Sequence, residues 1–330
     1  MERNKNPMKN RLAAGRLCAL ALTFGMAFPL LAQQGEERRR SDTSPIDLPG
    51  GSRVEFKSFS SESLGQERQY SIFFPPSYGK GKEDYPVIYF LHGLNNDHTS
   101  WTVERYGSLQ ATFESMIAAK EVPEFLFVCP RGDSSFYTNF INNGMRYEDY
   151  ITVDLIRHVE SSYRARKGRN NRAIAGTSMG GYGALKTAFK HPDLYASVAG
   201  HSPIVFPGKN PLDVPEQMKS SRMYAFFGGM LGNIFGNPID QSYWDQNNPL
   251  ILAKEAKLDG LHIYFDYGTA DRYNQSVRLG EGLKELDRIL TEAKVKHTFK
   301  EHPDEPHGWA LVDKHIHESL PFLTQSFDRR

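Results

Sequence analysis

Short apolar runs alternate with amphipathic segments along most of the chain. The run Val87–Leu91 is apolar at every position, which is typical of a strand that is covered on both faces of a sheet. Other β-prone runs lie at 54–59, 69–74, 125–129, 172–175, 196–199, 262–267 and 296–300, and helical patterns lie at 109–120, 147–163, 182–190, 276–294 and 311–322. The first two of these β-prone runs are expected to pair as antiparallel strands. The alternation that follows predicts an α/β fold with a mostly parallel central sheet and helices on both faces.

Residues 203–250 break this rhythm. The segment contains six prolines and a cluster of large apolar side chains, which are Met223, Tyr224, Phe226, Phe227, Met230, Leu231, Phe235 and Trp244. A connection this long inside a compact domain is usually functional. We therefore expect a lid-like insertion in which Phe226 and Phe227 form part of an acyl-binding wall. The alternative is a segment that only packs against the domain.

Residues 1–32 have the pattern of a signal peptide. Basic residues lead into an apolar run that ends at Ala32, directly before Gln33. A glycine and a proline interrupt this run, which is short for a membrane span; an uncleaved anchor is the alternative. Residues 33–52 are charged and then contain Pro, Gly and Ser, which predicts a flexible linker before a domain at 53–326.

The charge balance and the cysteines limit the partners of the exported chain. The chain has 40 basic and 39 acidic residues, of which the leader holds five and one, so 35 and 38 remain. That remainder lacks the basic excess of a nucleic-acid-binding protein, so no nucleic-acid partner is expected. Cys129 is the only cysteine after the leader, which excludes an intramolecular disulfide in the exported protein. Its apolar neighbours predict a buried strand residue.

The pentapeptide Gly176-Thr-Ser-Met-Gly180 carries the strongest chemical signal. It has the form G-x-S-x-G, follows a β-prone run and precedes a helical pattern, as a nucleophile elbow requires. Such a turn lifts the serine hydroxyl above the sheet, and its glycines stand where a Cβ would clash. We predict that Ser178 is a nucleophile; a glycine-rich turn without chemistry is the alternative.

A serine hydroxyl needs a base to take its proton and an acid to hold that base in the right tautomer. In chains with such an elbow, the acid and then the histidine follow the serine, on loops after late strands. Asp271 lies just past the strand-like run 262–267 and is the predicted acid, with Asp266 inside the run as the alternative. His307, in a turn-rich loop before the last helix, is the predicted base. The other histidines considered are His302, His315 and His317.

The negative charge that develops on an ester oxygen needs two preorganised N–H donors. The amide of Met179, directly after the serine, is the first predicted donor. The loop opened by Leu91-His-Gly-Leu94 supplies the second, at the amide of Leu94, because Gly93 allows the backbone to approach a substrate closely. His92 is expected to be a structural hydrogen-bonding residue.

Two further motifs are given little weight. Residues 131–134 spell Arg-Gly-Asp-Ser but follow a strand directly, so we expect a loop near the rim of the site. Asp97 and His98 could bind a metal, yet no further ligands share a recognisable spacing. We expect neither a metal nor a cofactor.

With these residues in view, the chain resembles the putative-esterase family of α/β-hydrolases, which includes feruloyl and acetylxylan esterases, S-formylglutathione hydrolases and mycolyltransferases. The resemblance runs from about Phe56 to Phe322. It is carried by Leu91-His-Gly-Leu94 with Trp101, Tyr150–Tyr163, Gly176–Leu185, Asn248-Pro249, Gly268–Asp271 and His307–Trp309. It implies an α/β-hydrolase fold with an inserted lid-like segment and serine-esterase chemistry.

These inferences together predict a secreted or periplasmic serine carboxylesterase that acts through an acyl-enzyme. Feruloyl or acetyl esters of polysaccharides are the candidate substrates, and the aromatic residues Trp101, Tyr137 and Trp309 are candidate substrate contacts. The alternatives are an acyltransferase to a sugar hydroxyl and a non-catalytic carbohydrate-binding module. Thioester hydrolysis of S-formylglutathione is chemically open, but that substrate is cytosolic and the leader predicts export.

The export hypothesis can be tested directly. Protein produced by its native host should be recovered outside the cytoplasm and should begin near Gln33, because the leader has the charge-then-apolar pattern of a cleaved signal. N-terminal sequencing checks this. An intact Met1 end in the cytosolic fraction would refute export and would revive the glutathione-thioester hypothesis.

Overall fold

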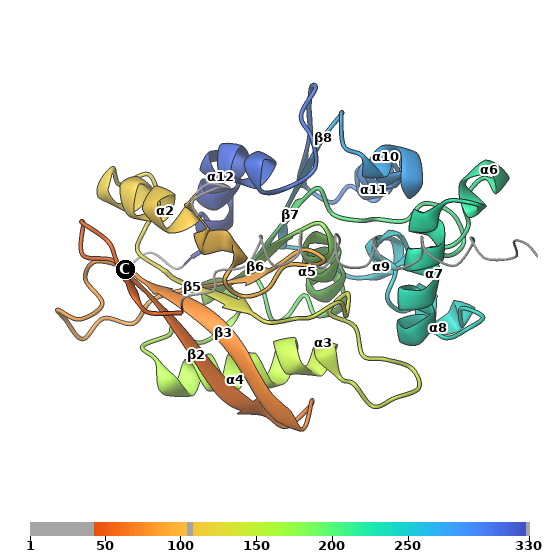
Figure 1. Ribbon diagram of the computed structural model, residues 1–330. Helices are drawn as coiled ribbons and strands as arrows, with labels where there is room; N and C mark the ends of the chain where they lie inside the picture. Colours follow the sequence, from red (N-terminus) through yellow and green to blue (C-terminus); the bar gives the residue numbers. More distant parts are fainter. Residues whose placement is uncertain (1–42, 104–107, 328–330) are drawn as a thin grey trace, which may run out of the picture. The chain divides into compact units, whose positions relative to one another are not determined.

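A computed structural model describes residues 43–103 and 108–327, and the account below concerns these residues. The predicted signal peptide and residues 33–42 of the predicted linker lie outside them. The described residues contain a nine-stranded sheet in the order β1-β2-β3-β5-β4-β6-β7-β8-β9 (Figure 1). The strands are β1 (Ile46–Asp47), β2 (Arg53–Ser61), β3 (Gln66–Phe74), β4 (Val87–Leu91), β5 (Leu126–Pro130), β6 (Arg172–Thr177), β7 (Ser197–His201), β8 (His262–Gly268) and β9 (His297–His302).

The sheet is antiparallel at one end and parallel over the rest. β1, β2, β3 and β5 form antiparallel neighbours, whereas all neighbours from β5 through β4 to β9 are parallel. The α/β fold predicted from the alternating pattern is confirmed. The eight strands that the sequence predicted are present, with ends that differ by three residues or fewer.

Both faces of the parallel region are buried, which explains the continuous apolar runs. In β4, Val87, Tyr89 and Leu91 pack into the core on one face. Ile88 and Phe90, between them, pack into the core on the opposite face. Successive side chains of a strand point to opposite faces, so a strand inside two helical layers needs an apolar residue at every position.

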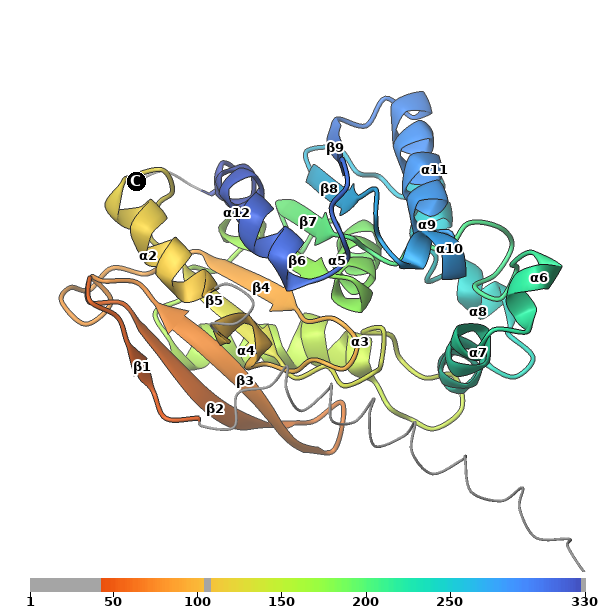
Figure 2. The same cartoon turned by 45° about the horizontal axis from the view of Figure 1, so that its top comes forward.

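Helices cover the two faces unequally. α2 (Leu109–Ala118) and α12 (Trp309–Thr324) pack on one face, and the helical run of α3 (Tyr147–Asp149), η3 (Tyr150–Leu155) and α4 (Ile156–Ser162) lies on the other (Figure 2). α5 (Met179–Lys190) contributes to the same core as this run. The remaining helices are η1 (Ser100–Thr102), η4 (Arg169–Asn171), α6 (Glu216–Lys219), α7 (Arg222–Phe235), α8 (Gln241–Asp245), α9 (Pro249–Glu255), α10 (Tyr273–Ser276) and α11 (Leu279–Glu292).

Two details differ from the sequence-based expectations. Part of the predicted linker belongs to the sheet: Ile46 and Asp47 pair with β2, and the Glu114 carboxylate accepts hydrogen bonds from the amides of Gly50 and Ser52. The composition of the linker did not predict this strand, because a two-residue edge strand has almost no sequence pattern of its own. The segment 203–250 is largely helical, with α6, α7 and α8 between β7 and α9. Among the described residues, no helix is both long enough and apolar enough to cross a membrane.

The parallel register determines where the site can form. Thr177 at the end of β6 pairs with His201 in β7, His201 pairs with Asp266 in β8, and Gly268 pairs with His302 in β9. The carboxyl ends of these strands therefore meet at one edge of the sheet. The loops after β6, β8 and β9 leave from this edge, and each carries one of the predicted catalytic residues.

Candidate active site

Ser178 occupies a strained turn between β6 and α5. Its φ is +58°, a left-handed value that is costly for a residue other than glycine. The turn is held because the Ser178 amide donates to the His201 carbonyl at 2.9 Å. A Cβ on Gly180 would lie 1.8 Å from the Leu91 carbonyl oxygen, so only glycine lets the first turn of α5 approach the end of β4. Ser178 is 8% exposed.

Asp271 and His307 meet above the ends of β8 and β9. His307 Nδ1 lies 2.5 Å from Asp271 Oδ2, and the other carboxylate oxygen accepts from the Tyr273 amide at 2.8 Å. These two hydrogen bonds fix the carboxylate, and the Nδ1 contact leaves Nε2 as the other nitrogen of the imidazole. The Tyr273 ring packs edge-on against the imidazole, with centroids 4.6 Å apart. In the part of the chain that the structure describes, no hydrogen bond joins Ser178 to His307.

Asp266, the alternative acid, is fully buried in a separate network. Its carboxylate contacts His201 Nδ1 at 3.0 Å and His302 Nε2 at 3.3 Å, and it accepts from the Tyr264 hydroxyl at 3.0 Å. Burial alone would raise the pKa of this carboxyl, but His201 and then His302 hold it below its ordinary value. His201 in turn contacts the Ser319 hydroxyl at 2.9 Å. This Ser-His-Asp arrangement is inaccessible, because Ser319, like the other two, is buried.

The loop after β4 lies against the elbow. A Cβ on Gly93 would be 3.3 Å from Ser178 Cβ, which is tight. The next amide, that of Leu94, and the Met179 amide at the start of α5 donate no hydrogen bond within the described residues. Met179 has no exposed surface, whereas Leu94 is partly exposed. Their role as donors to a bound oxygen stays a prediction.

His92 is buried and connects the loop after β4 to the loop after β5. Its Nε2 accepts from the Gly132 amide at 2.9 Å, so the proton must reside on Nδ1, which donates to the Gly93 carbonyl at 2.9 Å. Burial lowers the pKa of His92 to about 4. The ring is thus neutral near pH 7 and has both nitrogens engaged, as a structural residue would.

Two of the predicted aromatic substrate contacts are buried, which corrects that expectation. Trp101 has no exposed surface; its indole donates to the Ser71 hydroxyl at 2.7 Å, and its ring packs on Phe127. Tyr137 is also fully buried, with its hydroxyl 3.1 Å from the His92 carbonyl. Neither ring is accessible to a substrate.

Trp309 is almost buried and connects two loops of the site. Its indole donates to Asn96 Oδ1 at 2.5 Å, and its ring packs against Phe90. Asn96 lies in the loop after β4, while Trp309 lies two residues after His307. Trp309, predicted as a substrate contact, therefore mainly connects two loops. One is the loop after β9, which carries His307, and the other is the loop after β4, which carries Gly93.

In the segment predicted as a lid, Phe226 and Phe227 have different surroundings. Phe227 on α7 is 3% exposed and packs against Phe206 and Tyr273, with centroids 6.1 and 6.2 Å away. Phe226 is 47% exposed. Because Tyr273 also contacts His307, α7 is joined to the candidate base through two aromatic contacts.

Two weaker motifs have internal partners. The Asp97 carboxylate accepts from the amide and the hydroxyl of Thr99 within a turn. Asp133, in the Arg-Gly-Asp-Ser loop, accepts from Arg68 and the Tyr147 hydroxyl, both at 2.7 Å. Within residues 43–103 and 108–327, no group of three or more His, Cys, Asp or Glu side chains is arranged to hold a metal.

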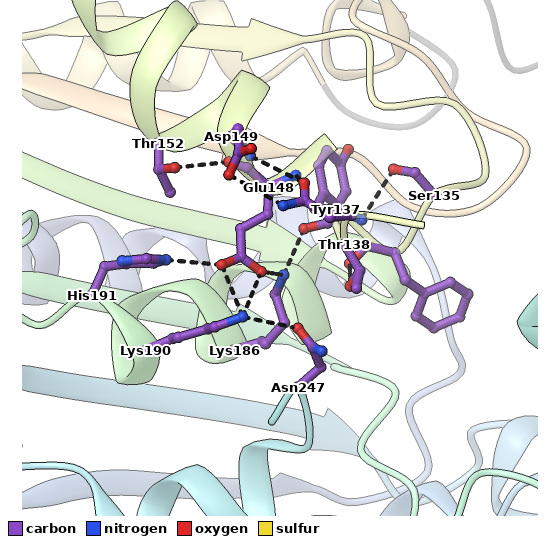
Figure 3. Close-up of polar contacts among 12 residues, drawn as sticks. Ser135, Tyr137, Thr138, Glu148, Asp149, Thr152, Lys186, Lys190, His191 and Asn247 are labelled. Atoms are coloured by element: carbon purple, nitrogen blue, oxygen red, sulfur yellow. Dashed lines mark hydrogen bonds and ion pairs between the residues drawn. The ribbon is translucent and has the colours of Figure 1, made fainter. Parts of the chain in front are cut away.

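A buried ion-pair network, which the sequence did not predict, supports α5, the elbow helix that begins directly after Ser178 (Figure 3). Lys186 on α5 is fully buried, and its Nζ donates to Glu148 Oε2 at 2.7 Å and to the Tyr137 carbonyl at 2.6 Å. Lys190 and His191 also contact the Glu148 carboxylate. Burial lowers the pKa of Lys186 to about 8. Lys186 and Glu148 are far apart in sequence, and each occupies a helical pattern where a charge normally faces solvent.

The chain matches known proteins over most of its length. A sequence model of the family described as putative esterase matches residues 61–316. An esterase of Mycobacterium tuberculosis is 26% identical over 262 residues, which cover 76% of this chain and 55% of that protein. An endo-1,4-beta-xylanase/feruloyl esterase of Xylanibacter ruminicola is 29% identical over 145 residues, 42% of this chain and 20% of that protein. A solved ferulic acid esterase is similar in fold, with a TM-score of 0.67 and 24% identity over 84% of this chain and 99% of its own.

These matches cover different shares of the matched proteins. The chain spans about half the length of the mycobacterial relative and a fifth of the xylanase/feruloyl esterase. The likeness to the solved ferulic acid esterase shows the fold.

The Glu148 network predicts a stability effect that depends on pH. Glu148→Gln should lower the free energy of unfolding by about 3–5 kcal/mol at neutral pH, because the Lys186 charge would lose its buried partner. Burial would raise the pKa of Glu148, but Lys186 and then His191 and Lys190 hold it well below the ordinary 4.5. The carboxylate's contribution is therefore fully present above about pH 4.5 and declines as the pH falls toward the much lower pKa of the folded state, so the difference between the two proteins should narrow in acid.

Urea unfolding of both proteins at pH about 7 and about 3.5 measures this difference. The control is Glu216→Gln, which removes an exposed carboxylate paired with Lys219 and should change the unfolding free energy little. Equal stabilities of wild type and Glu148→Gln at neutral pH would contradict the prediction.

Proposed function

The chain belongs to the putative-esterase family, and on that premise we propose that it is a serine carboxylesterase with Ser178, His307 and Asp271 as its catalytic triad. The main support is the 2.5 Å contact between His307 Nδ1 and Asp271 Oδ2 on the loops after β9 and β8. These loops leave the same sheet edge as the strained turn of Ser178.

In the proposed reaction, Ser178 Oγ attacks the ester carbonyl while His307 Nε2 takes the hydroxyl proton. Asp271 holds the Nδ1–H and stabilises the imidazolium that forms. The carbonyl oxygen becomes negatively charged and accepts hydrogen bonds from the Leu94 and Met179 amides. His307 then gives its proton to the leaving alcohol, and a water molecule repeats the sequence on the acyl-enzyme.

We propose an acyl or feruloyl ester of a polysaccharide as the substrate. Support comes from the relative named endo-1,4-beta-xylanase/feruloyl esterase, of which the match covers 20%. The exposed side of α7 offers an apolar surface for the acyl group, since Phe226 is half exposed and Met223 and Met230 beside it are partly exposed. Acyl pockets are mostly apolar with few polar groups. Export, proposed from the leader, agrees with a substrate outside the cell.

Ser178→Ala tests the proposed nucleophile. The variant should fold normally but lose ester hydrolysis by a factor of about 10⁴–10⁶, as removal of a triad member typically does. The assay is a panel of p-nitrophenyl esters of increasing chain length with methyl ferulate and acetylated xylan, and a fluorophosphonate probe should label only the wild type. An alcohol acceptor added to the same assay separates hydrolysis from transfer. Near-normal turnover by the folded variant would refute the assignment.

Phe226→Ala tests the acyl surface, with Phe227→Ala as the matched variant. Loss of Phe226 should lower kcat/KM for long acyl esters about 10-fold or more relative to acetate, since one apolar contact is worth about 1–3 kcal/mol. The thermal midpoint should change little because Phe226 is exposed. Loss of the buried Phe227 should instead cost about 3–5 kcal/mol of stability. An unchanged chain-length preference in Phe226→Ala would show that α7 only packs against the domain.

A further inference from the structure

His307 lies on the loop of residues 303–308, between β9 and α12, and this loop is held at two points. After His307, the Trp309 indole is bound by Asn96. Before it, Glu305 is bound on both sides. The Glu305 carbonyl accepts from the Ala270 amide at 3.1 Å, and a Cβ on Gly268 would lie 2.0 Å from that carbonyl oxygen. The histidine loop thus rests directly on the turn that carries Asp271.

The Glu305 side chain contacts the helix α12, whereas its carbonyl contacts the turn that carries Asp271. Its Oε2 lies 2.9 Å from His315 Nε2, and its Oε1 pairs with Lys314. Since α12 begins two residues after His307, these contacts close a short loop around the candidate base. Partial burial would raise the pKa of the Glu305 carboxyl, but the hydrogen bonds from Lys314 and His315 hold it below its ordinary value.

His315 lies between two carboxylates. Its second nitrogen, Nδ1, lies 3.2 Å from Glu318 Oε1, so both ring nitrogens face carboxylate oxygens. A carboxylate oxygen accepts hydrogen bonds, so each of the two glutamates offers His315 an acceptor. The hydrogen bonds from Lys300 and His315 keep the pKa of Glu318 below its ordinary value, which agrees with an ionised group.

The His315 imidazole is also held by a second ring. Its ring stacks on His302, with centroids 3.4 Å apart and planes 16° from parallel. His302 contacts the buried Asp266 carboxylate, which is anchored by His201 and Tyr264. A side chain with this many partners has one position, and Glu305 is tied to it.

We propose that Glu305, held by His315 through its carboxylate, is a positioning residue that sets His307 in register with Ser178 and Asp271. The inference rests on the proposed function, because it concerns the base of that reaction. Among the described contacts, no hydrogen bond joins Glu305 to His307; Glu305 acts by fixing the backbone two residues before the base. A misplacement of a catalytic group by about 1 Å can cost 100-fold in rate.

Glu318 supplies a matched control. Each of the two glutamates pairs with one lysine and with one nitrogen of the same imidazole. Glu318 lies on α12 itself, three residues after His315, whereas Glu305 lies on the histidine loop. Removing either carboxylate deprives His315 of one acceptor. Only removal of Glu305 releases the loop.

The experiment compares Glu305→Ala, Glu305→Gln and Glu318→Ala in the full chain, with p-nitrophenyl acetate as substrate. Glu305→Ala should lower kcat by about 10–100-fold with KM nearly unchanged, since the base is displaced but the acyl surface is intact. Its rate of labelling by a fluorophosphonate should fall in parallel. Glu305→Gln, which keeps an acceptor oxygen, should recover most of the activity, and Glu318→Ala should stay close to the wild type.

Thermal midpoints separate positioning from stability. If both alanine variants lose stability and kcat to the same extent, or if Glu305→Ala is fully active, the positioning role is refuted. Failure of the proposed function looks different, because Ser178→Ala would then remain active whatever the Glu305 variants do. Should Glu305→Ala not fold, the kcat of Glu305→Leu relative to Glu318→Leu decides, because leucine removes the acceptor oxygen but fills the space: equal values refute the proposal.

Discussion

The contact of the elbow helix with the end of β4 is the constraint on which the site depends. The first turn of α5 approaches the Leu91 carbonyl so closely that no side chain fits at Gly180. This approach forces Ser178 into a left-handed backbone conformation and sets it against Gly93 in the neighbouring loop. Leu94 and Met179 each follow one of the two residues that meet at this contact, Gly93 and Ser178. The backbone strain is sustained because the surrounding strands and helix leave no alternative.

Buried charges support this arrangement from both sides of the sheet. On one side Lys186 joins the elbow helix to Glu148, and on the other Asp266 joins β7, β8 and β9 through histidines. A buried carboxylate with all its hydrogen bonds satisfied holds its neighbours in a single arrangement, whereas one that loses a partner is costly. Asp271 differs, since its carboxylate is engaged only by the Tyr273 amide and by His307 among the described contacts.

The aromatic residues of the molecule are divided between support and surface. Trp101 and Tyr137 fill the layers behind the loop after β4, and Trp309 connects that loop to the histidine loop. α7 presents the reverse case, because it buries Phe227 against Tyr273 and leaves Phe226 open to solvent. The inserted segment therefore carries an exposed aromatic side chain at Phe226. The predicted catalytic residues lie instead on loops that follow strands of the sheet.

The sequence by itself determined the features whose signals are local. Alternating apolar runs predicted eight strands of the sheet because a buried strand needs an apolar residue at each position. The glycines around Ser178 predicted the elbow, since backbone crowding is written into five consecutive residues. Tertiary structure decided the rest. Asp266 and Asp271 both lie near the end of β8, and only the fold shows that one faces His201 while the other faces His307. The ion pairs of Glu148 with Lys186 and of Glu305 with His315 join separate segments. Side-chain burial at Trp101 and Tyr137 depends on layers that no local pattern encodes.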